Sequence, residues 1–368
     1  MRVVIAPDSF KTALDAASVA RCMAEGVRRA RPDAEIVEIP MADGGEGTLE
    51  VLVNSARGNR RRVAAHDPLG RPIQVTVGLI NQAATAVIEL AQVSGYGLVP
   101  PDKRDPLITS TVGLGEVIRA VLDAEIEDAI LAVGGSATVD GGAGMMQALG
   151  LDYFDRHGHA IEPPCGGGKL VEIERFIWDE PPAGLDTIRL TVACDVLNPA
   201  CGPHGAAVVF GPQKGASPEA VRLLDEGLSH WAELLEHACG RPLRNEPGTG
   251  AAGGVALPLL AFTSAVLVPG VDLVAEAVGL AGAIGDADLV LTGEGCVDGQ
   301  SLMGKVVGAV ARMSRSAAVP CVAICGKKGP GSEQIAELLD DLFTLDAPIE
   351  ETQCRLKDVA QSVAAAMI

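Results

Sequence analysis

Carboxylate, hydroxyl and glycine residues gather in short loops that follow predicted strands. In the first two of these loops the residues are Asp8, Ser9, Lys11, Asp43, Gly44 and Gly45. Carboxylates can hold magnesium or accept a hydroxyl proton. Glycine lets backbone N–H groups approach phosphate oxygens closely, and a following helix N-terminus favours an anion. The pattern indicates phosphate chemistry, although a single loop of this kind is more often a tight turn with a helix cap.

Later loops repeat the pattern, so that five such loops follow predicted strands. The further residues that could bind phosphate or substrate are Gly134, Gly135, Ser136, Gln300, Ser301 and Lys305. Phosphoryl transfer also needs metal ligands and a group that orients or deprotonates the acceptor hydroxyl. Asp195 and Asp298 suit that work, and each also fits an Asx turn or a helix cap. Asp140 and Glu294 are further candidate carboxylates in these loops.

Two motif matches and the lysines need separate weighing. Residues 248–253 match GxGxxG but follow no strand, and residues 299–305 match GxxxxGK but precede Val306 instead of Ser or Thr. Neither is predicted to be a nucleotide fingerprint. Lysine is rare, with eight residues. Lys11 is expected to contact a ligand, whereas Lys305 and Lys214 are open between a phosphate contact and a structural role.

Strands and helices that alternate along the chain must position these residues. Strands are predicted at 2–5, 35–39, 129–133, 188–194, 287–291 and 320–324, helices at 16–30, 109–123 and 218–239, and antiparallel strands at 61–66, 73–80 and 85–90. This pattern predicts an α/β fold with mostly parallel sheets, in which ligands bind beyond the carboxyl ends of the strands. We expect the five loops to share one sheet edge. The expected division is a discontinuous α/β domain of residues 1–75 and 285–368, with residues 76–284 inserted.

Composition excludes several classes of function. The 368 residues carry a formal net charge of −19, which argues against binding to nucleic acid or to an anionic membrane. Residues 247–271 carry no charge, but glycine and proline interrupt them, so we expect a buried loop, helix and strand there instead of a membrane span. Nine cysteines without a CxxC pair indicate reduced thiols. No signal-peptide pattern precedes the first strand, and a cytoplasmic location is expected.

Six blocks in order together resemble one family. They are residues 6–11, 40–48, 134–142, 210–216, 250–254 and 292–301. The blocks are similar to those of glycerate kinases of the bacterial glycerate 2-kinase type, and the resemblance covers the chain from Arg2 to about Gly329. Departures at Val139, at 200–201 and at 306–307 remove no charged or glycine position.

The resemblance implies two unlike α/β domains with the active site in the cleft between them. One domain would be flavodoxin-like and the other built from both chain ends. The resemblance also implies ATP and magnesium as partners and D-glycerate as the acceptor. The product would be 2-phosphoglycerate or, less usually for this type, 3-phosphoglycerate. The loops support the same function independently of the resemblance, because they predict phosphate binding, catalytic or metal-binding carboxylates and a small anionic acceptor. A homo-oligomer is compatible with the sequence.

The expected mechanism gives each group a role. Magnesium is held by Asp195 or Glu294, and Asp298 or Asp195 accepts the glycerate hydroxyl proton. Lys11 and the backbone N–H groups of the glycine loops neutralise the transferring phosphoryl group and the substrate carboxylate. The alternatives are a kinase for another small hydroxy acid, a nucleotide-binding regulator without turnover and a binding protein for small acids.

Overall fold

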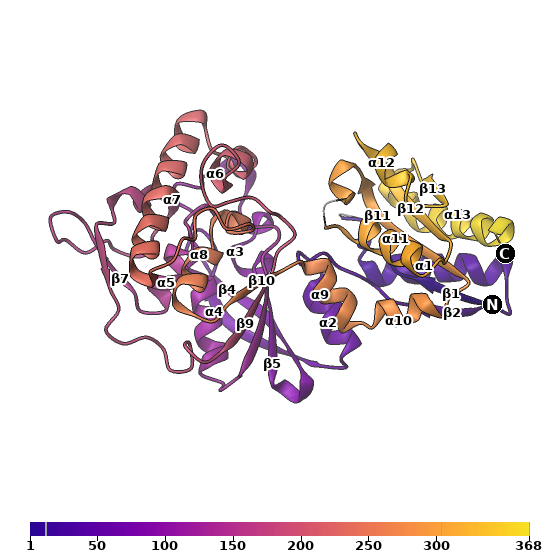
Figure 1. Cartoon of the computed structure of the whole chain (residues 1–368), viewed down its shortest axis with the longest axis horizontal. Coiled ribbons are helices and arrows are strands. Elements are labelled where there is room, and N and C mark those ends of the chain that lie inside the picture. Colours follow the sequence, from indigo (N-terminus) through magenta and orange to yellow (C-terminus); the bar gives the residue numbers. More distant parts are fainter. Residues whose placement is uncertain (12, 303, 368) are drawn as a thin grey trace. The chain divides into compact units, whose positions relative to one another are not determined.

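A computed structural model describes residues 1–11, 13–302 and 304–367 (Figure 1). It divides into two compact units, each treated separately below. Unit 1 comprises residues 1–55 and 269–368, and unit 2 comprises residues 56–268. These limits differ from the expected boundaries after 75 and 284. Residues 59–66 belong to unit 2 because they pair with strand 72–80, and residues 270–277 belong to unit 1 because they pack on helix 48–55.

Unit 1 is built on a five-stranded sheet whose strands are all parallel. Its strands are β1 (Arg2–Ile5), β2 (Glu35–Glu38), β11 (Leu289–Val297), β12 (Cys321–Lys328) and β13 (Asp341–Thr344). The spatial order is β13-β12-β11-β1-β2, which is the 2-1-3-4-5 order of flavodoxin-like sheets. The flavodoxin-like order therefore belongs to the unit built from both chain ends, whereas the sequence analysis gave those two descriptions to different domains. The order reverses between β1 and β11.

Alternating side chains cover both faces of this sheet. On one face Val322 and Ile324 of β12 pack with α1 and α13, and on the other Ala323 and Cys325 pack with α11 and α12. This is the period of two that a strand buried on both faces requires. The helices of unit 1 are α1 (Ala16–Ala30), α2 (Thr48–Ser55), α9 (Gly270–Ala277), α10 (Leu280–Gly285), α11 (Val306–Ser316), α12 (Ser332–Ala336) and α13 (Thr352–Met367).

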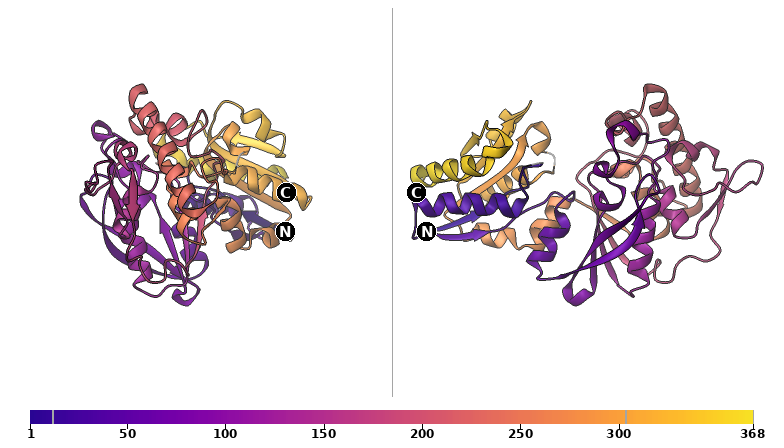
Figure 2. Two further views of the ribbon diagram at one scale, coloured as in Figure 1. Left: turned by 60° about the vertical axis from the view of Figure 1, so that its left-hand side comes forward. Right: turned by 180° about the vertical axis from the view of Figure 1, so that it is seen from behind.

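Helices α1 and α13 come from opposite ends of the chain and lie side by side (Figure 2). The α1 helix begins after Asp15, whose Oδ1 accepts a hydrogen bond from the Ser18 amide at 2.7 Å. The backbones come close at Gly26, where an added Cβ would lie 2.3 Å from the Lys357 carbonyl oxygen. A residue without a side chain is therefore required at this crossing.

Unit 2 is built on a six-stranded mixed sheet in the order β10-β9-β6-β5-β4-β3. Its strands are β3 (Asn59–His66), β4 (Pro72–Ile80), β5 (Thr85–Glu89), β6 (Asp128–Ala132), β9 (Arg189–Ala193) and β10 (Val266–Val268). The pairs β3–β4 and β4–β5 are antiparallel and the other pairs are parallel, so the predicted antiparallel segment is confirmed. A small hairpin of β7 (Asp152–Phe154) and β8 (Arg175–Ile177) lies apart from this sheet.

The core of unit 2 is aliphatic, with a small aromatic cluster. Trp231 of α7 is fully buried, packs edge-on against Tyr153 and Phe176, and donates its indole N–H to the Gly141 carbonyl oxygen at 3.0 Å. The helices of unit 2 are α3 (Ala91–Ser94), α4 (Val112–Leu122), α5 (Ala143–Ala148), α6 (Ala206–Phe210), α7 (Pro218–Cys239) and α8 (Ala256–Phe262). None of the described helices is long and apolar enough to cross a membrane.

The predicted α/β class with mostly parallel sheets is confirmed, but the glycine loops do not share one sheet edge. The loops that follow β1, β2 and β11 lie in unit 1, and those that follow β6 and β9 lie in unit 2. The predicted loop, helix and strand at 247–271 is confirmed by α8 and β10. Strand 287–291 is wrong in extent, because β11 continues to Val297 and carries Glu294 on the strand itself.

Candidate active site

Asp8 follows β1 at the point where the strand order of unit 1 reverses, which is where ligands of such sheets bind. Its amide donates to the Gly293 carbonyl oxygen of β11 at 2.8 Å, which fixes the loop after β1 against β11. Its Oδ1 accepts from the Ser9 amide at 2.6 Å. Only 6% of Asp8 is exposed, whereas Lys11 in the same loop is exposed. The loop therefore presents one buried carboxyl group and one accessible cation.

Burial raises the pKa of Asp8 to about 8, and the negative charges of Asp43 and Glu294 act in the same direction. The hydrogen bond from Ser9 and the charge of Lys11 oppose this shift. Three carboxyl groups thus repel one another at the carboxyl end of one sheet. A cation that enters this cluster would favour the ionised form of Asp8.

Glu294 on β11 is joined to the next turn of chain through a serine. Only 5% of Glu294 is exposed, and its Oε1 accepts from the Ser301 hydroxyl at 2.5 Å. The same hydroxyl oxygen accepts from the Asp298 amide at 3.1 Å. Burial raises the pKa of Glu294 to about 6, while the Ser301 hydrogen bond and the charge of Lys305 hold it lower than burial alone would.

Lys305 reaches both carboxylates of this segment. Its Nζ lies 3.5 Å from Asp298 Oδ1 and 3.9 Å from Glu294 Oε2. The residue directly precedes α11, and about a quarter of its side chain is exposed. The lysine is therefore placed on the carboxylate cluster, beside the start of a helix, and keeps access to solvent. This position fits a phosphate contact better than that of a fully solvated helix lysine.

Asp43, Gly44 and Gly45 form the loop after β2. Asp43 Oδ1 accepts from the Gly45 amide at 3.1 Å, which is Asx-turn geometry. The helix α2 begins at Thr48, whose hydroxyl oxygen is buried without a hydrogen-bond partner among the described residues. Asp43 therefore has a structural role through one oxygen, while its charge also acts on Asp8 and Glu294.

The donor chemistry of unit 1 fits magnesium, although its described residues form no protein-only metal cage. Within residues 1–11, 13–302 and 304–367, no three His, Cys, Asp or Glu side chains are arranged to hold a metal ion. Magnesium is usually bound by one or two carboxylates, with phosphate oxygens and water as its other ligands. Buried carboxylates such as Glu294, which raise one another's pKa, match that requirement.

Unit 2 holds a second polar cluster, at the carboxyl end of β6. The predicted residues Gly134, Gly135 and Ser136 follow this strand, and the loop is fixed to the segment after β5 by hydrogen bonds from Tyr96 N to Gly135 O and from Ala137 N to Ser94 O. Ser136 is 8% exposed, and its hydroxyl oxygen accepts from Lys214 Nζ at 2.6 Å.

Asp140, in the same loop, has a structural role. It is fully buried, and its carboxylate accepts from Thr111 N and Oγ1, both at 2.7 Å, and from the Gly142 and Gly144 amides. Burial raises the pKa of Asp140, and these hydrogen bonds oppose that shift. The carboxylate therefore holds the loop and the start of α5 together.

The predicted catalytic pair is divided between the units. Asp195 follows β9 in unit 2 and is partly buried, whereas Asp298 belongs to unit 1. The structure brings Asp8, Asp43 and Glu294 together, and it joins Ser301 and Lys305 to Glu294. The side chain of Gln300 lies outside those that the structure describes.

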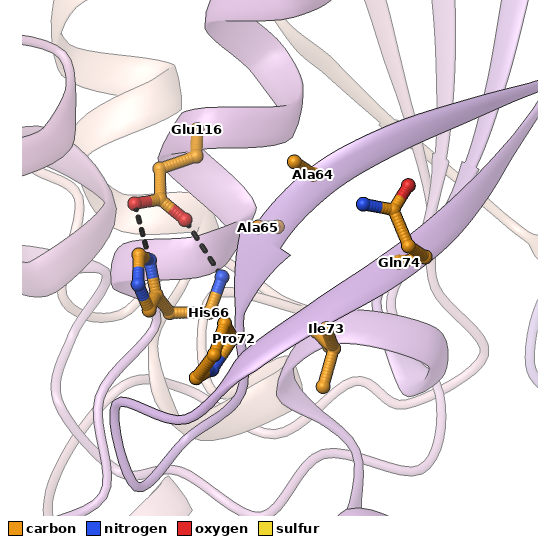
Figure 3. A pocket seen from close by; sticks show the side chains of 7 residues that line it. All are labelled: Ala64, Ala65, His66, Pro72, Ile73, Gln74 and Glu116. Carbon is orange, nitrogen blue, oxygen red and sulfur yellow. Dashed lines mark hydrogen bonds and ion pairs between the residues drawn. The ribbon is translucent and has the colours of Figure 1, made fainter.

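Sequence reasoning left Lys214 outside the predicted site. A usable signal was available, because lysine is rare in this chain and Lys214 lies in a glycine-rich loop. A pocket of about 340 Å³ in unit 2 was not foreseen either (Figure 3). Its lining residues are Ala64, Ala65, His66, Pro72, Ile73, Gln74 and Glu116. His66 Nδ1 lies 2.8 Å from Glu116 Oε1, and its amide donates to Oε2 at 2.8 Å. None of the predicted site residues lines this pocket.

Comparison with known families decides the relationship. The family model described as the glycerate kinase family matches residues 3–368. The chain belongs to the glycerate kinase family. The resemblance carried by the six sequence blocks is thereby confirmed.

Several relatives are similar to this chain over nearly their whole length. The glycerate kinase of Halalkalibacterium halodurans is 43% identical over 370 residues, which cover 98% of this chain and 97% of that protein. The glycerate 2-kinase of Escherichia coli strain K12 is 39% identical, over 100% of this chain and 98% of that protein. Among solved structures, a Salmonella typhimurium LT2 protein assigned as glycerate kinase 2 matches with a TM-score of 0.86 and 40% identity, over 99% of this chain and 97% of that one. Glycerate kinases are phosphotransferases, so the predicted enzyme class is confirmed.

Proposed function

We propose that this protein transfers a phosphoryl group from ATP to the 2-hydroxyl of D-glycerate and forms 2-phosphoglycerate. The observation that carries the proposal is the cluster of carboxyl groups, Ser301 and Lys305 at the strand reversal of unit 1. The similarity to the E. coli glycerate 2-kinase supports the position of transfer. A kinase for another small hydroxy acid, or one that forms 3-phosphoglycerate, is the alternative.

The residues of unit 1 would divide the work. Asp298, held by its amide hydrogen bond to Ser301 Oγ, would accept the proton of the attacking hydroxyl. Lys11 and Lys305 would neutralise charge that develops on the transferred phosphoryl group. Asp8, Ser9, Asp43, Gly44 and Gly45 would bind substrate or phosphate. Glu294 would hold magnesium, which supplies charge neutralisation on the ATP phosphates when bound.

The residues of unit 2 would bind an anion and contribute one carboxylate. Gly134, Gly135 and Ser136 follow a strand and offer backbone N–H groups and a hydroxyl. Asp195 would serve as the base or as a magnesium ligand, so it stays an alternative to Asp298 in the first role and to Glu294 in the second. Unlike Asp140, it is only partly buried.

A cytoplasmic location belongs to this proposal. None of the nine cysteines forms a disulfide among the described residues, and five of the nine are buried. Unpaired thiols of this kind are typical of a reducing compartment.

A phosphorus NMR experiment tests the function. The purified protein is incubated with ATP, magnesium and D-glycerate, and the spectrum is followed for a new phosphomonoester signal. Coupling of that signal to one proton identifies the 2-phosphate, and coupling to two protons identifies the 3-phosphate. ATP that stays intact at high enzyme concentration, with D-glycerate and with other hydroxy acids, would reject the kinase function and leave the nucleotide-binding regulator and the binding protein for small acids.

A further inference from the structure

Lys214 is a buried cation in unit 2. It ends the 3-10 helix Pro212–Lys214, and only 4% of it is exposed. Its Nζ donates to the Ser136 hydroxyl oxygen at 2.6 Å and to the Thr138 carbonyl oxygen at 2.8 Å. Both acceptors are uncharged. Lysine is seldom buried to this degree without a charged partner, because transfer of an isolated ammonium group out of water is costly.

Lys214 makes no ion pair with any described residue, and no carboxylate oxygen of these residues lies within 4 Å of its Nζ. Asp140 is the ionisable group whose charge bears on Lys214. Its two oxygens are already engaged by Thr111, Gly142 and Gly144. Asp140 therefore offsets the positive charge of Lys214 only from beyond ion-pair distance.

Two unsatisfied hydroxyl groups belong to the segments that hold Lys214. The hydroxyl oxygens of Thr138 and Ser94 are buried without a partner among the described residues, and both residues are fully buried. Ser94 and Ser136 belong to segments joined by the hydrogen bond from Ala137 N to Ser94 O at 2.8 Å. Buried polar groups are normally satisfied, so two unsatisfied hydroxyls in the segments around Ser136 point to a missing partner in this part of unit 2.

We propose that Ser136 and Lys214 form a binding site for one oxyanion group of a substrate, called the seat below. The negative charge of this ligand would stabilise the buried ammonium group of Lys214. This inference rests on the proposed function, because it takes the oxyanion to be the carboxylate of D-glycerate or a phosphate of ATP. The hydroxyl oxygen of Ser136 accepts from Lys214, so its own proton is available to the ligand. Lys214 thus acts through Ser136, as a positioning residue.

The seat has a consequence for protons. Burial lowers the pKa of Lys214 to about 7, and the charge of Asp140 opposes that shift. A large part of the unligated protein therefore carries a neutral amine above pH 7, and a bound anion restores the ammonium form by uptake of a proton. Above that pH the affinity for the ligand should fall by about tenfold for each pH unit.

Titration calorimetry on the full chain tests the seat. D-glycerate, ATP with magnesium, and sulfate are titrated separately at about pH 6 and about pH 8.5, in buffers of different ionisation enthalpy. D-glycerate and sulfate do not change charge in this range. The wild-type protein should take up about one proton at the higher pH and almost none at the lower, with the ligand that occupies the seat. The glycerate and ATP arms identify which substrate supplies the oxyanion.

Variants separate the seat from ordinary structural roles. Lys214→Met should abolish the proton uptake and weaken binding of that one ligand by about tenfold or more, because a buried positive charge behind Ser136 is lost. Ser136→Ala should weaken binding of the same ligand but leave the proton uptake on binding unchanged. Lys169→Met is the matched control, because Lys169 Nζ donates to the carbonyl oxygens of Glu162 and Pro164 at an exposed site, and its binding should be unchanged.

The outcomes decide between the two proposals. In one outcome, only sulfate causes a proton uptake that depends on Lys214, and the NMR experiment shows no turnover. This result would support the oxyanion site at Ser136 and Lys214 and reject the kinase function. Wild-type affinity and proton count in Lys214→Met for all three ligands would reject the seat, whatever the turnover. Thermal melts show whether each variant is folded. A strongly lowered melting temperature in Lys214→Met without a change in binding would assign the lysine a structural role only.

Discussion

Removal of the Ser301 hydroxyl should move the pH dependence of catalysis. In Ser301→Ala, Glu294 loses the hydrogen bond at 2.5 Å that favours its ionised form. Glu294 is 5% exposed, so water cannot readily replace that bond. The pKa of this carboxyl should therefore rise above its present value of about 6.

The size of the shift follows from the hydrogen bond. A hydrogen bond to a charged group contributes about 1.5–3 kcal/mol, and one pKa unit corresponds to about 1.4 kcal/mol. The pKa of Glu294 should rise by about one to two units. A carboxyl group holds magnesium only when ionised, so activity is lost on acidification as Glu294 takes up a proton. The midpoint of this loss should lie near pH 6 in the wild-type protein and at about pH 7 or above in Ser301→Ala.

The assay is kcat/KM for ATP measured from about pH 5 to about pH 9, since this parameter reports ionisations of the free enzyme. Thr292→Val is the matched control, because it removes another buried hydroxyl of β11, one that donates to the Ala6 carbonyl oxygen and touches no carboxylate. In Thr292→Val, the fall of kcat/KM at low pH (the acid limb of the profile) should stay at the wild-type pH. An unshifted acid limb in a folded and active Ser301→Ala protein would refute the argument that Ser301 tunes Glu294.

Further substitutions test the remaining assignments. Asp298→Asn and Asp195→Asn should each lower kcat by about 100-fold or more with little effect on ATP binding, and near-normal turnover in both would remove them from the chemistry. Gly26→Ala should destabilise unit 1 by about 1–3 kcal/mol in denaturant unfolding, because its Cβ would lie 2.3 Å from the Lys357 carbonyl oxygen. The pKa of Asp8 is raised in the folded protein to about 8, so its stabilising contribution is complete below its unfolded value and is lost as pH rises through about 8. Asp8→Asn should therefore melt at a higher temperature than wild type above pH 8 while losing activity, and an equal or lower melting temperature there would contradict the raised pKa.

Local signals were sufficient for some elements and misleading for others. Helix α7 has the bounds predicted from the sequence, and in the structure Ser217 caps its start, Pro218 occupies its first position and Gly240 ends it. The end of β11 was missed because Gly293 suggests a loop. In the structure Gly293 lies within β11. A side chain does not fit there, because a Cβ would lie 2.1 Å from the Ile324 carbonyl oxygen of β12.

The candidate site was predictable in its residue types but not in its contacts. Carboxylates and glycines at strand ends follow from local sequence, so Asp8, Asp43 and Glu294 could be named in advance. Their mutual effect on pKa depends on β1 and β11 being neighbours, which no local pattern specifies. The burial of Lys214 against Ser136 joins residues 78 positions apart. Only tertiary structure reveals it.

The division of unit 1 between both chain ends affects the order in which the protein can fold during synthesis. Residues 1–55 leave the ribosome before unit 2, but their strand β1 pairs with β11, which follows the whole of unit 2. At 5–20 residues per second, unit 2 takes roughly 10–40 s to be made. During that delay the apolar residues Val3, Val4 and Ile5, all fully buried in the finished sheet, have no second neighbour. This nascent segment is a natural client for a chaperone, and unit 2 can complete its fold before unit 1.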